Sequence, residues 1–194
     1  DHIVRDTVFK NNKRTVLRNG VAVCVGCSDN TVDLSGHALK FWEPKNILIE
    51  RVVFDGNENR PGHTTAKGSA FVVANRGGAR SDTGVASTTR VLNSTFRNNK
   101  ASGSGAAIIV ASQGSSKTQK VLIDQLTSFV GNIDSDGPNN FNLFSPRSGS
   151  MEINFLQCAP GTYASLGGMG LDSSAITQGG TTSIRTVPWI SGCT

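Results

Sequence analysis

The sequence has few charged residues, no long apolar run and no helical periodicity. Only 17% of its 194 residues are charged, against roughly 25% in an average soluble domain. No stretch approaches the ~18 apolar residues of a membrane-spanning helix, so no membrane span is expected in this chain. Amphipathic patterns of helical length are missing, while glycine is abundant, with 22 residues. These features argue against a helical fold and predict one all-β domain with many turns.

The sequence also has no signal peptide and opens on Asp1 rather than methionine. We therefore expect a processed product or a piece of a longer precursor. An Asn-x-Thr triplet at Asn93 is a candidate glycosylation site. Together with the cysteines described next, this triplet favours an extracellular or cell-surface location.

Cysteine is scarce, but its number is even, which favours disulfides and an oxidising compartment. The four candidate disulfide residues are Cys24, Cys27, Cys158 and Cys193. The close pair Cys24 and Cys27 does not predict zinc, because no second close pair of ligands is visible. A thioredoxin-like role would need an α/β context. We expect a structural disulfide, either local or to the C-terminal cysteines.

The chain is basic, with a formal net charge of +5 and a pI near 9.3. A loose basic group near the N-terminus comprises Arg5, Lys10, Lys13, Arg14 and Arg18. These residues form either a solvated surface or a surface that attracts an anionic polysaccharide. Nucleic acid is not an expected partner, because no aromatic residues alternate with the basic ones.

The most informative feature is a Phe-x-x-Asn pattern that occurs four times at comparable positions. Its residues are Phe9 and Asn12, Phe54 and Asn57, Phe96 and Asn99, and Phe129 and Asn132. The spacings between successive Phe residues are 45, 42 and 33. Short aliphatic runs precede the last three copies, and a small-residue turn with a second apolar run follows two of them. Each unit therefore predicts a strand, a turn, a second strand and a long polar loop.

A recurring pair of strands favours a parallel β-helix, or solenoid, of four to five coils over residues 1–157, with long loops on one side. The Phe residues of successive coils are expected to stack about 4.8 Å apart, and the Asn residues to form a ladder along the axis. A β-sandwich of hairpins is the alternative, although hairpin dipeptides do not recur between the strands. A chance pattern is the other alternative.

The third copy carries a family resemblance. The sequence Phe96–Ile108 resembles the repeat of chlamydial polymorphic outer membrane proteins, which couples Phe-x-x-Asn to a Gly-Gly-Ala-Ile type sequence. Here Gly105-Ala106-Ala107-Ile108 stands for the second half. The resemblance covers about residues 4–145 and implies a right-handed parallel β-helix at a cell surface. It also implies an adhesive or structural role without a cofactor.

Residues 158–194 are expected to form a separate Cys-flanked segment. Its opening, Cys158–Tyr163, is similar to the start of Cys-rich modules in ephrin-receptor-like repeats, but only Cys193 follows. The segment is expected to be either a loop closed by the two cysteines or a cover for the end of the β-helix. A cover would protect strand edges that otherwise recruit other chains.

Two carboxylates offer an alternative, enzymatic site, because glycoside hydrolysis uses a pair of them. Alignment of the aliphatic runs places Glu50, Ser94 and Asp124 at matching positions, with the two carboxylates roughly 9.6 Å apart across two coils. Outward-facing, solvated side chains are the alternative. Asp134 and Asp136 are either calcium ligands or parts of a polar turn.

The sequence therefore predicts a non-catalytic extracellular structural protein, either an adhesin fragment or the subunit of a surface filament. Its expected partners are further copies end to end, other surface proteins or an anionic polysaccharide. No cofactor, metal site or catalytic residue is expected. The alternative function is a polysaccharide-active enzyme or a carbohydrate-binding β-helix.

Overall fold

A computed structural model describes residues 1–13, 21–25, 37–42, 46–59, 70–76, 87–103, 105–113, 119–135, 137–138, 140–144, 151–157, 176–179 and 182–188. Every regular element in these ranges is a β-strand, and the pairing is parallel in all three larger sheets. The predicted all-β chain with parallel strands is thus confirmed. The same ranges contain no helix long and apolar enough to cross a membrane.

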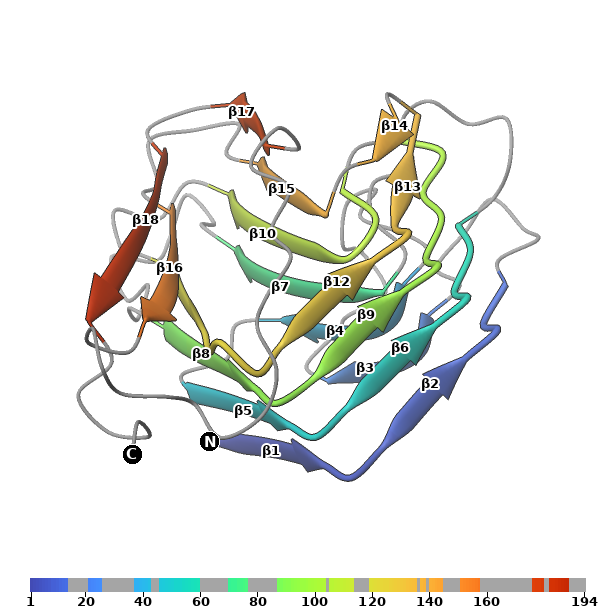
Figure 1. Cartoon of the computed structure of the whole chain (residues 1–194), viewed down its shortest axis with the longest axis horizontal. Coiled ribbons are helices and arrows are strands. Elements are labelled where there is room, and N and C mark those ends of the chain that lie inside the picture. Colours follow the sequence, from blue (N-terminus) through green and yellow to red (C-terminus); the bar gives the residue numbers. More distant parts are fainter. Residues whose placement is uncertain are drawn as a thin grey trace.

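Three sheets enclose the interior (Figure 1). Sheet I has six strands in the order β1 (His2–Arg5), β5 (Asn46–Glu50), β8 (Ser87–Leu92), β11 (Gln119–Ile123), β16 (Met151–Gln157) and β18 (Thr182–Pro188). Sheet II has four, in the order β2 (Val8–Lys10), β6 (Val53–Asp55), β9 (Thr95–Arg97) and β12 (Ser128–Val130). Sheet III has six, in the order β3 (Val21–Val25), β4 (His37–Trp42), β7 (Phe71–Arg76), β10 (Ile108–Gln113), β15 (Phe141–Phe144) and β17 (Ile176–Gly179). A two-stranded antiparallel ribbon joins β13 (Ile133–Asp134) to β14 (Gly137–Pro138).

Over the four Phe-x-x-Asn units the chain passes from sheet I to sheet II to sheet III and back, so each unit has strands in three sheets rather than the expected two strands. The aliphatic run and the Phe segment are separate strands, because the backbone bends between them. The residue at this bend has a left-handed conformation in three units, with φ of 49° at Asp6, 53° at Arg51 and 44° at Asn93. The backbone N–H of Asp6 donates to Glu50 O, and that of Arg51 to Leu92 O, which ties each bend to the next unit.

Sheets I and III extend beyond the four Phe-x-x-Asn units. The strand β4 is level with the first unit because it pairs with β7, and β3 lies beyond it. At the other end, β17 pairs with β15 and β18 pairs with β16. Both strands come from residues 158–194, so part of this segment lies in the same sheets as the preceding chain.

The interior is filled by alternate side chains of the strands. In β5 and β11 the burial alternates residue by residue, with Ile47, Ile49, Val121 and Ile123 pointing inward. Burial of one such side chain contributes about 1.5–3 kcal/mol. Sheet III is buried on its outer face as well, since Val72 is 0% exposed although its neighbour Val73 belongs to the core.

Candidate functional site

Four Phe side chains form a continuous row through the interior. The rings of Phe9 and Phe54 stack with centroids 5.0 Å apart and planes 8° apart. The next pairs, Phe54 with Phe96 and Phe96 with Phe129, stack at 4.7 Å and 5.1 Å. Phe141 meets Phe129 edge-on at 4.9 Å, so it ends the parallel stack. Register produces this row, because Phe9 pairs with Phe54, Phe54 with Phe96, and Phe96 with Phe129.

Four Asn side chains form a second row beside it. The Nδ2 of Asn12 donates to Asn57 Oδ1 at 2.8 Å, Asn57 donates to Asn99 at 2.9 Å, and Asn99 donates to Asn132 at 2.8 Å. Asn132 donates in turn to Asn140 Oδ1 at 2.9 Å. Sequence reasoning missed Asn140, because it belongs to no repeat.

Each inner Asn of this row satisfies its buried polar atoms completely. The second Nδ2 hydrogen of Asn99 reaches Phe54 O at 3.0 Å, and its Oδ1 accepts both the backbone N–H and the side chain of Asn57. Asn57 and Asn99 are 0% exposed. A buried amide that lost these partners would be costly, so the row fixes the register of the units.

The residue before each Asn has a left-handed backbone, and its identity alternates between Asn and Gly. The φ values are 54° at Asn11, 63° at Gly56, 55° at Asn98 and 63° at Gly131. A Cβ on Gly56 would lie 2.6 Å from Asn11 Oδ1, and one on Gly131 would lie 2.9 Å from Asn98 Oδ1. Each Asn side chain therefore occupies the space that the glycine of the following unit leaves open.

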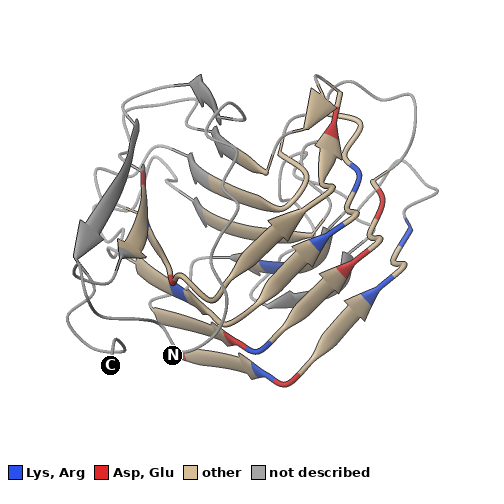
Figure 2. Ribbon diagram, in the orientation of Figure 1, with Lys and Arg blue, Asp and Glu red and all other residues tan. Residues whose placement is uncertain are grey.

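Charged side chains alternate in sign across the outer side of sheet II (Figure 2). Lys10, Asp55 and Arg97 are in register, and Asp55 contacts Lys10 at 3.9 Å and Arg97 at 2.9 Å. Further along the chain, Lys13 contacts Glu58 at 3.3 Å. The hydrogen bond from Arg97, aided by the charges of Arg97 and Lys10, lowers the pKa of Asp55.

A second group of ion pairs lies at the bend between sheets I and II. Arg51 contacts Asp6 at 2.7 Å and Glu50 at 2.9 Å, and Arg5 also pairs with Glu50. The hydrogen bond from Arg51 lowers the pKa of Asp6. Both groups are partly exposed, so each pair contributes modestly to stability.

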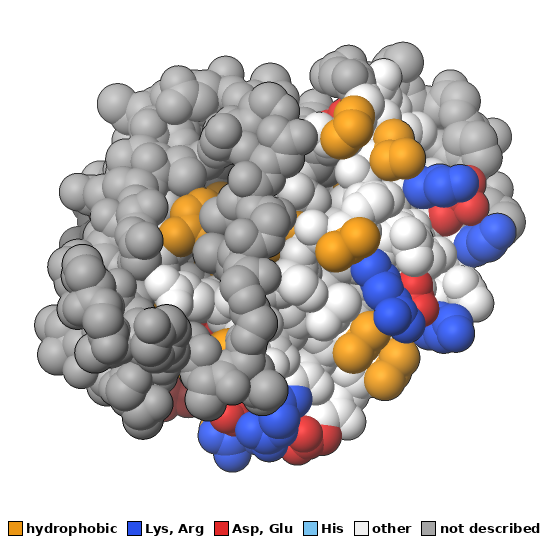
Figure 3. Space-filling view, in the orientation of Figure 1, with side chains coloured by type: hydrophobic (Ala, Val, Ile, Leu, Met, Phe, Trp, Pro, Cys, Tyr) orange, Lys and Arg blue, Asp and Glu red, His pale blue; other side chains and the backbone are white. Residues whose placement is uncertain are grey.

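Apolar side chains lie beside these charged rows on the same face (Figure 3). Val8 on β2 and Val130 on β12 are 62% and 61% exposed. These strands are the two edges of sheet II within the described chain. Val53 donates to Thr7 O and Asn11 donates to Asp55 O, so the odd-numbered residues of β2 bond to β6. The backbone groups of Val8 and Lys10 therefore point to the open edge.

The candidate catalytic positions need two corrections. Glu50 pairs with Leu92, not with Ser94, so the matching position in the third unit is apolar. The alignment failed at β8 because Val91, not Leu92, is in register with Ile49 and Ile123, so Leu92 takes the position next to Glu50.

The second correction concerns Asp124, which is 2% exposed rather than outward-facing and solvated. Both of its carboxylate oxygens accept the backbone N–H of Asn93, at 3.0 Å and 2.9 Å, and Oδ1 also accepts from Thr127 Oγ1 at 2.6 Å. The fourth unit has one extra residue between Ile123 and Ser128, so this carboxylate takes the place of the carbonyl that caps the bend in earlier units. Burial raises the pKa of Asp124.

The other candidates have structural surroundings or lie outside the described residues. Asp134 accepts the backbone N–H of Gly105 at 2.9 Å and belongs to the β13–β14 ribbon, whereas Asp136 lies outside the described ranges. Within those ranges, no group of three His, Cys, Asp or Glu side chains is arranged to hold a metal.

The candidate glycosylation residue, Asn93, is exposed at a bend. Among the cysteines, only the backbone of Cys24 is described, on β3 in register with Lys40. Cys27, Cys158 and Cys193 lie outside the described residues, so their pairing stays a prediction.

Comparisons with protein-family models, with curated proteins and with solved structures find no match to this chain.

Proposed function

We propose that the chain is a right-handed parallel β-helix that acts as a non-catalytic structural protein outside the cell. Its role would be that of an adhesin fragment or the subunit of a surface filament. The observation that carries this proposal is the pair of buried rows along the stacked units, one of Phe9, Phe54, Phe96 and Phe129 and one of the Asn residues. Such rows give a stiff, repetitive body that grows by the addition of units.

The use of the carboxylates supports a structural role over an enzymatic one. Glu50 is held by Arg5 and Arg51, Asp55 by Arg97 and Lys10, and Asp124 caps a backbone N–H. Hydrolysis of a glycoside needs one carboxyl that donates a proton and one that attacks or activates water, both facing the substrate. Here the three carboxylates instead hold successive units together through ion pairs and hydrogen bonds.

The open edge of β2 supports end-to-end association. Unpaired strand edges recruit other chains, and a head-to-tail contact that does not close generates fibres. The exposed Ile3 and Val8, both 62% exposed, add apolar surface at this end of the molecule. Other surface proteins with a strand to add are the alternative partner at the same edge.

Electron microscopy of the purified chain tests the filament version, with Val8→Pro as the decisive variant. Proline removes a backbone N–H that points to the open edge, so the internal pairing of β2 with β6 is kept. Filaments formed by the parent chain and by Val8→Ala, but not by Val8→Pro, would support the proposal. Dispersed particles of the parent chain at all concentrations would contradict the filament version and leave the adhesin fragment.

A further inference from the structure

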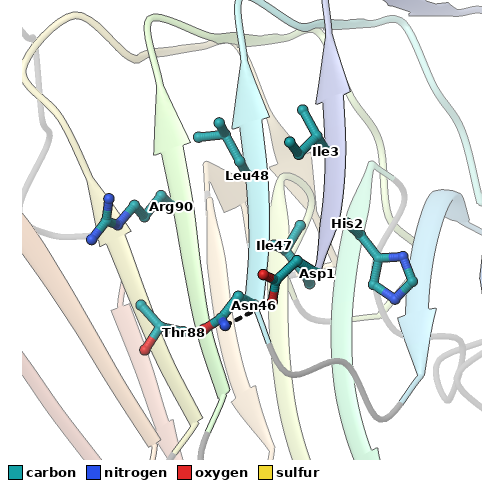
Figure 4. A pocket seen from close by; sticks show the side chains of 8 residues that line it. All are labelled: Asp1, His2, Ile3, Asn46, Ile47, Leu48, Thr88 and Arg90. Carbon is teal, nitrogen blue, oxygen red and sulfur yellow. Dashed lines mark hydrogen bonds between the residues drawn. The ribbon is translucent and has the colours of Figure 1, made fainter.

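A groove of about 420 Å³ lies on sheet I at its first three strands (Figure 4). Its volume falls within the range of small-molecule sites, about 300–1,000 Å³. The argument depends on six of the residues that line it, which come from β1, β5, β8 and the residue before β1. These are Asp1, Ile3, Asn46, Leu48, Thr88 and Arg90.

Strand register arranges these side chains in two rows. Ile3 pairs with Leu48, and Leu48 with Arg90, which gives a row that starts apolar and ends in a cation. Asn46 pairs with Thr88 in the second row. Neighbours within a row are about 4.8 Å apart across the strands, and the rows are about 6.6 Å apart along them.

Asp1 completes the polar row at its far end. Its Oδ1 accepts a hydrogen bond from Asn46 Nδ2 at 2.8 Å, and the two side chains meet in the groove (Figure 4). The polar row therefore offers carboxylate, amide and hydroxyl groups side by side. A ligand with several hydroxyl groups could both donate to and accept from such a row.

Arg90 has no acidic neighbour in its own row. Its register partners on the two flanking strands are Leu48 and Leu122, both apolar. Within the described chain Arg90 makes no ion pair, whereas Lys120, two residues before Leu122, contacts Glu152 at 3.9 Å. An exposed guanidinium with free donors binds a carboxylate through two parallel hydrogen bonds.

We propose that this groove binds a sugar acid, such as a uronic acid residue of an anionic polysaccharide. The sugar carboxylate pairs with Arg90, and its hydroxyl groups meet Asn46, Thr88 and Asp1. Its C–H face lies on Leu48 and Ile3. The carboxylate of Asp1 disfavours densely charged polymers, because it would repel a second anionic group placed over the polar row. The proposed ligand therefore carries one carboxylate for each sugar ring and free hydroxyl groups beside it.

Calorimetry with an unesterified oligogalacturonate tests this proposal, with its methyl ester and a sulfated dextran as comparison ligands. The variant Arg90→Gln is expected to weaken binding by about tenfold or more, as is esterification of the ligand. Lys100→Gln is the matched control, because Lys100 is also exposed, makes no ion pair in the described chain and lies outside the groove. Its effect is expected to stay within about twofold, as for a distant screened charge. Thr88→Val is expected to weaken binding without removing charge.

Two outcomes would overturn the proposal. The first is no binding by the parent chain. The second is equal weakening by Arg90→Gln and Lys100→Gln together with equal affinity for sulfated dextran, which would show diffuse attraction to a basic surface. Binding is measured on the dispersed Val8→Pro variant as well. Val8 lies outside the groove, so the sugar site and the filament proposal succeed or fail separately.

Discussion

At the residue scale, the contribution of a buried Phe to stability depends on its position in the row of stacked rings. Phe96 is 0% exposed and stacks on both Phe54 and Phe129. Phe9 is 8% exposed and has only one stacked neighbour among the described residues. The same residue type therefore contributes differently at the middle and at the end of the row.

Phe96→Ala is expected to lower the free energy of unfolding by about 3–5 kcal/mol, as for other buried aromatic residues. Phe9→Ala should cost clearly less, because solvent already reaches its ring and fewer contacts are lost. Chemical denaturation monitored by circular dichroism measures both values. Equal losses for the two variants would mean that the row does not act as a continuous core.

Asp55 makes an acid-dependent contribution to stability that a single substitution can test. The pKa of Asp55 is lowered in the folded state, mainly by the hydrogen bond from Arg97. Its ionised form therefore stabilises the fold above the unfolded-state pKa of about 3.9, and this stability is lost as the pH falls through the folded-state pKa.

Arg97→Gln is expected to raise the pKa of Asp55 towards its ordinary value and to weaken the loss of stability on acidification. Titration of the Asp55 carboxyl carbon by NMR measures the first effect, and melting temperatures below about pH 5 measure the second. Lys100→Gln removes the same charge without touching Asp55 and should leave that pKa almost unchanged. A similar rise in both variants would contradict the role given to the hydrogen bond.

At the element scale, the bends decide how the strands meet. Two kinds of bend use left-handed residues: the bend between sheets I and II in three units, and the bend before the Asn of the pattern in all four. Sequence reasoning found the second bend, because Asn and Gly signal it. It missed the first, because the three positions share no residue type: Asp6 and Asn93 favour a left-handed conformation, but Arg51 does not. The units were consequently expected to have two strands instead of three.

Gly56→Ala is expected to destabilise the fold by about 1–2 kcal/mol, because an L-residue is strained at its φ of 63°. The new Cβ would also approach Asn11 Oδ1 at 2.6 Å. In a double-mutant cycle, Asn11→Gly should recover part of the loss by removing that contact. Gly137→Ala is a control for backbone strain alone, because its φ is 118° and no atom lies within 4 Å of the new Cβ. If Asn11→Gly restored none of the stability lost in Gly56→Ala, the steric part of this explanation would be wrong.

At the scale of the whole molecule, the arrangement of the strands depends on pairing between segments that are far apart in the sequence. The sequence predicted the all-β class and the parallel strands, because short apolar runs recur at comparable positions around each Phe-x-x-Asn copy. It could not predict the role of Asp124, which follows from one extra residue in the fourth unit. Nor could it predict the groove, since Asp1, Asn46 and Arg90 face one surface only through strand register.

Hydrogen exchange should reveal a gradient along the stack. The amide protons of Asn57 and Asn99 bond to buried side-chain oxygens of the next unit and are expected to be the slowest to exchange. Amides of Val8 and Lys10 on the open edge should exchange fastest among the paired strands. Exchange measured by NMR at a single pH tests this order. Uniform protection across all units would indicate global opening only, whereas slow exchange at Val8 would indicate that the edge is covered.

Because Asn and Gly alternate at the left-handed position before the pattern Asn, the structural period of the chain is two units. The charges of Lys10, Asp55 and Arg97 also alternate in sign from one unit to the next. Loss of the single unit that carries Phe54 would place Arg97 beside Lys10, two like charges. It would also place the Asn98 side chain against Asn11, where Gly56 now leaves space. Loss of the two units with Phe54 and Phe96 would instead bring Gly131 over Asn11 and preserve the joint. We therefore expect such a molecule to tolerate the duplication or deletion of two units more readily than that of one unit.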